Sequence, residues 1–125
     1  ENYFLYFETI DLCRNLYNQN KKMYIVNNLK FDHLGTSSTN KKYSQMIQIN
    51  RNWHFSWSKF YYFRKNFNYF FALKKIIPNI FQSIKGLLIS LILLRFSHIK
   101  LHFSSLNGIL SSVLLMRSYF RPNID

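Results

Sequence analysis

The sequence predicts a mixed α/β fold that is mostly helical. A helical run covers residues 9–19, and the short apolar run at 23–26 has the length and composition of a strand. Large apolar residues then recur at steps of three to four residues over 51–65, which is typical of an amphipathic helix. Longer apolar segments separated by Lys and Arg follow. We therefore expect two parts, a mixed part at 1–67 and a helical extension at 68–125.

Two carboxylates, Glu8 and Asp11, lie at the start of the first predicted helix. Acidic residues are scarce, because the chain has only five of them and a formal net charge of +12. Residues three apart share one side of a helical turn, so the two carboxylates should lie close together, as a general base and its partner would. The alternative is that both acids only favour the positive end of the helix.

The helix predicted at 51–65 has one strongly aromatic face. An aromatic stripe of this kind forms a core or, alternatively, a platform for sugars or lipids. Its residues at helical spacing are Trp53, Trp57, Phe60, Tyr61 and Arg64.

The order of these segments resembles the C-terminal half of the catalytic domain of family 2 glycosyltransferases, especially the bacterial rhamnosyltransferase-like members. The matching segments cover residues 1 to about 64. The resemblance implies the C-terminal part of a GT-A-like (Rossmann-like) domain, followed by amphipathic helices at 68–125. The segments are Phe-Leu-Tyr-Phe-Glu-x-x-Asp-Leu-Cys-Arg at 4–14, the strand at 23–26, His33 with Gly-Thr-Ser-Ser at 35–38, and the helix that opens with Arg-Asn-Trp-His at 51–54.

The resemblance implies an inverting transfer of a sugar from a nucleotide-sugar donor to a hydroxyl of a glycan or lipid-linked acceptor. Such reactions belong to cell-surface polysaccharide or glycolipid synthesis. Many members have a second acid directly after the glutamate, where this chain has Thr9. The role of base therefore falls to Glu8, with Asp11 orienting or replacing it. The expected substrate contacts are Arg51, Trp53 and His54.

A divalent cation, Mg²⁺ or Mn²⁺, is also implied, because it would neutralise the leaving diphosphate. His33 is the expected metal or diphosphate contact, and the alternative is an ordinary loop histidine. The chain contains no Asp-x-Asp motif and no Gly-rich phosphate loop. We therefore expect a fragment that lacks the nucleotide-binding half and is inactive alone.

The extension at 68–125 contains an uninterrupted apolar run at 86–94, between Lys85 and Arg95. This run has about half of the ~20 residues that span a bilayer. A short run with basic flanks fits an interfacial helix on an anionic membrane or, alternatively, the apolar face of a helical subdomain. We expect a cytoplasmic protein, peripheral on the inner face of the cell membrane.

Two other classes of function compete with sugar transfer. A basic, aromatic-rich chain is typical of nucleic-acid-binding proteins, but the basic residues are spread along the chain and no recognition motif occurs, so we expect no nucleic-acid partner. A non-enzymatic, membrane-associated helical protein would explain residues 68–125. It would not explain the carboxylate pair or the Arg-Asn-Trp-His order at 51–54.

Overall fold

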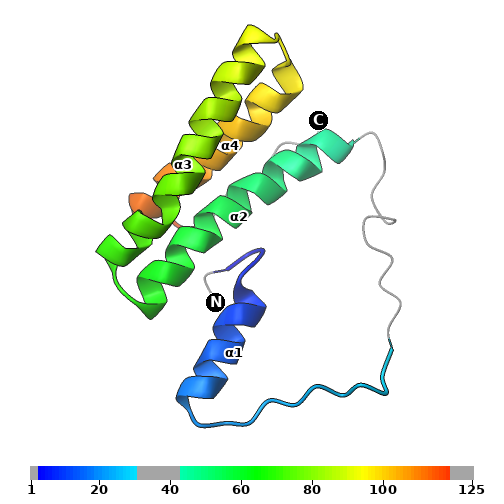
Figure 1. The fold of residues 1–125 in the computed structure, drawn as a ribbon, viewed down its shortest axis with the longest axis vertical. Coiled ribbons are helices and arrows are strands. Elements are labelled where there is room, and N and C mark those ends of the chain that lie inside the picture. Colours follow the sequence, from blue (N-terminus) through cyan, green and yellow to red (C-terminus); the bar gives the residue numbers. More distant parts are fainter. Residues whose placement is uncertain (1–2, 31–42, 119–125) are drawn as a thin grey trace.

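The computed structural model describes residues 3–30 and 43–118, and the regular structure in these ranges is helical (Figure 1). The helices α2, α3 and α4 pack pairwise against one another. The shorter α1 lies beside the C-terminal half of α2 (Figure 1). The helices are α1 (Glu8–Asn18), α2 (Ser44–Asn66), α3 (Tyr69–Ile92) and α4 (Phe96–Val113).

The predicted mixed α/β fold is wrong, because the described ranges contain no strand. The run at 23–26 is non-helical chain that contacts water, with Ile25 92% exposed. A strand is stable only where a neighbouring strand pairs with its backbone N–H and C=O groups. Residues 3–30 and 43–118 provide no such neighbour, so they do not form a GT-A-like (Rossmann-like) domain.

The start of α1 agrees with the prediction to within one residue, since the helix begins at Glu8. No side chain caps it, and the acids of its first turn, Glu8 and Asp11, face its positive end. The two residues before it, Tyr6 and Phe7, have positive φ angles of 68° and 66°. This backbone is costly for aromatic residues and persists only where packing enforces it. Both rings pack against Phe55 of α2.

The aromatic stripe of α2 forms the core, as the first of the two alternatives predicted. Trp53, Trp57 and Phe60 are buried. Phe60 packs with Ile76 of α3 and Ile109 of α4, so the core lies where these three helices meet.

The helix α3 begins at an Asn68 cap, whose Oδ1 accepts a hydrogen bond of 2.8 Å from the N–H of Phe71. The helix continues through Pro78. Pro78 lies on the exposed side, where water can satisfy the carbonyl that loses its N–H partner. Past its end, Leu94 has a positive φ of 51° and the N–H of Arg95 bonds to the carbonyl of Ser90 at 2.9 Å. This bond is typical of a Schellman turn.

The helix α4 begins at Phe96. It approaches α2 most closely at Gly108. A Cβ atom at this position would lie 3.1 and 3.2 Å from the carbonyl carbon and Cα of Trp53, and closer still to its carbonyl oxygen. Only a residue without a side chain lets the two backbones meet here.

We predict that Gly108→Ala destabilises the protein by about 1–3 kcal/mol, because the added methyl group pushes α4 away from the α2 backbone. Gly86→Ala is the matched control. The atoms nearest to its methyl group belong to the side chain of His102 and not to a backbone, so the clash requires a shift of one ring instead of a whole helix. Both changes gain about 1 kcal/mol in helix propensity, so that term cancels. Urea unfolding of both variants measures the difference, and equal stabilities would show that the close approach at Gly108 is not required.

Candidate functional site

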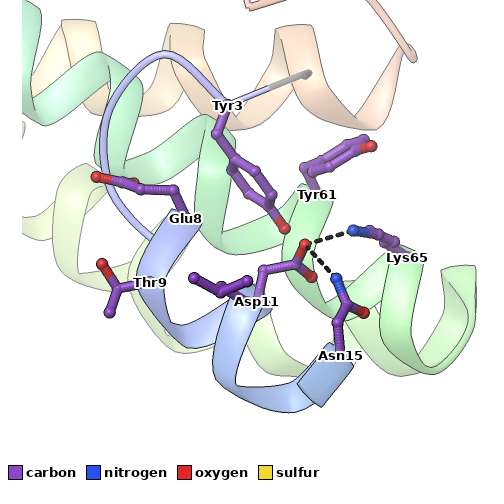
Figure 2. A pocket seen from close by; sticks show the side chains of 8 residues that line it. Tyr3, Glu8, Thr9, Asp11, Asn15, Tyr61 and Lys65 are labelled. Atoms are coloured by element: carbon purple, nitrogen blue, oxygen red, sulfur yellow. Dashed lines mark hydrogen bonds and ion pairs between the residues drawn. The ribbon is translucent and has the colours of Figure 1, made fainter. Parts of the chain in front are cut away.

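The first turns of α1 and the C-terminal half of α2 border a pocket of about 530 Å³ (Figure 2). The pocket contains both carboxylates that the sequence singled out, Glu8 and Asp11. Aromatic, amide and ammonium groups complete its walls. The lining residues are Tyr3, Glu8, Thr9, Asp11, Leu12, Asn15, Tyr61 and Lys65.

The Asp11 carboxylate is buried and fully engaged. Asp11 is only 6% exposed. It pairs with the Lys65 ammonium and accepts a hydrogen bond of 2.8 Å from the amide of Asn66. Asn15, one turn along α1, donates a longer bond of 3.5 Å. Burial alone would raise the pKa of Asp11, but the hydrogen bonds from Asn66 and Lys65 and the lysine charge lower it below its ordinary value.

The Glu8 carboxylate has the opposite environment. It is exposed at the edge of the pocket and makes no hydrogen bond or ion pair with the described residues. In Figure 2 its side chain points away from the Asp11–Lys65 pair. One carboxylate is therefore fixed as an anion in the wall, and the other is available to a molecule that enters the pocket.

Two tyrosine rings form the wall between these carboxylates. Tyr3 and Tyr61 meet edge to face, with centroids 5.0 Å apart and planes at 84°. Tyr61 is fixed from behind by stacking on Trp57 at 5.0 Å. The hydroxyl of Tyr3 points toward Asp11 (Figure 2). Burial and the negative charge of Asp11 both raise the pKa of the Tyr3 phenol, so that it stays protonated at every physiological pH.

The other predicted site residues lie elsewhere. Arg51, Trp53 and His54 occupy the middle of α2 and do not line the Glu8 pocket. Arg51 is half-buried, and the indole of buried Trp53 donates to Asn107 at 2.7 Å. His54 is fully buried, with Nδ1 3.1 Å from Ser118 Oγ. Their role as substrate contacts stays a prediction.

Trp53 also lines a second, smaller pocket between α2 and α4. Its volume is about 290 Å³. This pocket has one ammonium group and no carboxylate, so it lacks a group that could act as a base. The other lining residues are Ile49, Lys100, Phe103, Ser104 and Asn107.

The predicted metal contact, His33, lies outside the described residues. Within 3–30 and 43–118, no three His, Cys, Asp or Glu side chains come together as metal ligands do. The Glu8 pocket does not fit a Mg²⁺ or Mn²⁺ ion either, because the lysine ammonium already occupies the buried carboxylate.

The sequence did not reveal Tyr3, Lys65 or Asn66 as parts of the site. Lys65 and Asn66 are 54 and 55 residues from Asp11, and no local spacing connects them. The sequence did contain one signal for a partner of Asp11, because an acid that is buried in so basic a chain needs a cationic partner. That rule does not say which of the 17 Lys and Arg residues is the partner.

The chain matches no protein-family model, no curated protein and no solved structure.

We predict that Asp11→Asn lowers the free energy of unfolding at pH 7 by about 1–3 kcal/mol, since it removes a charged hydrogen-bond acceptor from Lys65 and Asn66. The pKa of Asp11 is lowered in the folded state, so its contribution is complete above the ordinary pKa of about 3.9 and is lost as the pH falls through the folded value. The stability difference from wild type should therefore shrink below about pH 4.

The matched control for this prediction is Glu8→Gln, which removes an exposed carboxylate from the same helix. Its unfolding free energy should fall by at most about 0.3–1 kcal/mol, the contribution of one exposed negative charge at the start of a helix. Urea titrations between pH 3 and pH 7 measure both variants. A loss that is the same for both, or that does not depend on pH, would contradict the assigned role of Asp11.

Proposed function

We propose that the Glu8 pocket binds the acceptor of a sugar-transfer reaction, and that Glu8 is the general base. The donor is a nucleotide-sugar and the acceptor is a glycan or a lipid-linked sugar. In this proposal residues 1–67 belong to the catalytic part of an inverting glycosyltransferase, and residues 68–125 are an extension. It concerns the reaction, not a Rossmann-like fold, which residues 3–30 and 43–118 do not have.

The observation that carries the proposal is the unequal environment of the two carboxylates. Asp11 has a lowered pKa and a cationic partner, so it is a poor proton acceptor. Glu8 is accessible and unpaired among the described residues, so an entering hydroxyl can reach it. Of the two roles expected for Asp11, orienting the site is therefore favoured over acting as the base.

On the side of the sugar acceptor, the reaction needs only one group that accepts a proton. The acceptor oxygen forms a bond to the anomeric carbon as its proton passes to the Glu8 carboxylate. The bond from that carbon to the diphosphate breaks in the same step, the nucleoside diphosphate leaves with the electron pair, and the configuration inverts. The rings of Tyr3 and Tyr61 provide apolar surface of the kind that packs on sugar faces.

The donor side of the reaction is less defined. Arg51, Trp53 and His54 stay proposed substrate contacts on α2, and the divalent cation would be held mainly by ligands beyond the described residues. The cation would stabilise the charge of the leaving diphosphate. No step in the described pocket is assigned to it.

The proposed location is the cytoplasm, at the inner face of the cell membrane. Among the described helices, α3 is long and apolar enough to cross a membrane, by length and composition alone. The peripheral location is favoured because Lys85 divides α3 into two uncharged runs, 76–84 and 86–92, and each is about half of a membrane span or less.

A second candidate is a membrane-associated helical protein without catalytic activity. The observation in its favour is that α3 exposes large apolar side chains such as Phe70 and Phe81. It gives no reason for an accessible carboxylate beside two tyrosine rings. The loss of a chemical step in a Glu8 variant is therefore the result that separates the two candidates.

We predict that Glu8→Gln in the full-length protein lowers kcat by ~10²–10⁴, with little change in donor affinity, because the amide keeps the shape of the side chain but accepts no proton. Lys21→Gln, an exposed change near the end of α1, is the control and should leave kcat unchanged. Radiolabelled sugar transfer measures both. Near-normal turnover of the Glu8 variant would refute its role as base.

We also predict that the 125-residue chain alone binds no nucleotide-sugar, because it contains neither an Asp-x-Asp motif nor a Gly-rich phosphate loop. Calorimetry with Mn²⁺ and a panel of nucleotide-sugars is the measurement. Micromolar binding would contradict the assignment of the donor site to another part of the protein.

A further inference from the structure

The exposed surface of α3 is divided into two parallel stripes. At 100° per residue, one stripe contains only apolar side chains and the neighbouring stripe contains Lys74 and Lys85. Phe70, Phe81 and Leu88 are 81%, 69% and 54% exposed, so the apolar stripe has no cover in the described residues. The residues of the apolar stripe are Phe70, Ile77, Phe81, Ile84, Leu88 and Leu91.

The side of α3 that faces the protein combines small and large residues. Ala72, Ile76, Ser83 and Ser90 are buried there, and Tyr69, Leu73 and Ile80 pack against the core beside them. The hydroxyl of Ser90 donates to the Gly86 carbonyl at 2.7 Å, so it needs no partner across the interface. A helix of a water-soluble domain normally buries its large apolar residues. Here one set of apolar residues is packed inside and a second set, the apolar stripe, faces outward, as in helices that contact lipid.

Charge indicates which lipid this surface would meet. Residues 69–118 contain six Lys or Arg residues and no Asp or Glu. The six are Lys74, Lys75, Lys85, Arg95, Lys100 and Arg117. Such a segment is attracted to the negative surface of an anionic bilayer, and the attraction adds to the burial of apolar side chains at the interface.

We propose that α3 lies flat on an anionic lipid bilayer. The apolar stripe enters the boundary between headgroups and acyl chains, and Lys74 and Lys85 contact the lipid phosphates. The apolar stripe and its lysines would thus be the surface that holds the protein at the membrane, in the peripheral location proposed above. The proposal does not depend on sugar transfer.

Two other occupants of the stripe fit the structure less well. A second copy of the chain would bring two acid-free, basic segments together, and their charges repel. A membrane-spanning α3 would place Lys85 in the hydrocarbon, between Phe81 and Leu88, at considerable cost. A bilayer surface accepts both stripes, because the ammonium groups stay in water while their stems lie along the interface.

A fluorescent probe on single cysteines tests the orientation of α3. Cys13→Ser removes the native thiol, and the probe is then attached at Phe81→Cys, Leu88→Cys or Gln82→Cys. Gln82 is exposed on the other side of the lysine stripe and is the matched control. With vesicles of three parts phosphatidylcholine and one part phosphatidylserine, emission should shift to the blue at 81 and 88 and stay unchanged at 82. A shift at all three sites would indicate insertion across the bilayer and overturn the flat orientation.

Paired substitutions test the two stripes separately by vesicle flotation. Phe81→Gln with Leu88→Gln should weaken binding at least tenfold to any vesicle. Lys74→Gln with Lys85→Gln should weaken binding to anionic vesicles by about twentyfold, at about fivefold for each lysine. Lys21→Gln with Lys22→Gln removes the same charge from an exposed segment after α1 and should have little effect. High salt should weaken binding without abolishing it.

Several outcomes would overturn the proposal. One is a protein that binds neither anionic nor neutral vesicles. Another is an equal loss of vesicle binding for the two pairs of lysine substitutions. The third is a concentration-dependent dimer that Phe81→Gln dissociates. Circular dichroism confirms that each variant is folded. Glu8→Gln should bind vesicles like wild type, so failure of the membrane proposal and failure of the sugar-transfer proposal give different results.

Discussion

The attachment of α1 to α2 depends on one buried carboxylate. Asp11 accepts hydrogen bonds from Lys65 and Asn66 at the end of α2. A buried anion is tolerated only when such partners replace water. This attachment fixes the helix on which Glu8 lies, so the availability of Glu8 follows from the engagement of Asp11. The same helical turn provides an anchored anion and an accessible one.

Aromatic packing fixes the orientation of α1 against α2. The guanidinium of Arg14 lies 4.3 Å from the centroid of the Phe67 ring, and Tyr3 packs on Tyr61. The hydroxyl of Ser58 donates to the carbonyl of Leu5 at 2.8 Å, which holds the segment before α1 against α2. These contacts offset the cost of the two positive φ angles before the helix. The left-handed turn then directs α1 along α2, so Glu8 and Tyr61 border the same pocket.

Local patterns predicted part of this structure. Periodicity located the aromatic core of α2, and the position of the acids located the start of α1, because both signals act over one or two turns. The strand at 23–26 was a false signal, since strand composition without a pairing neighbour gives exposed coil. The place of both acids in the first turn of α1 was predictable for the same local reason, but their opposite environments were not. Lys65, by contrast, meets Asp11 through the fold of the whole chain.

The carboxylates of the Glu8 pocket and the basic residues of α3 and α4 lie in different parts of the molecule. Glu8 and Asp11, the acids of the described residues, both belong to the pocket beside α1, whereas α3 and α4 are basic and free of acids. A bilayer with negative charge would attract the basic segment, whereas the pocket, in which Lys65 neutralises Asp11, keeps the one unpaired negative charge of Glu8. Both proposals together therefore predict an oriented molecule, with α3 on the lipid and Glu8 turned toward the aqueous phase. A lipid-linked acceptor would then have to extend from the headgroups into the aqueous phase to bring its hydroxyl to Glu8.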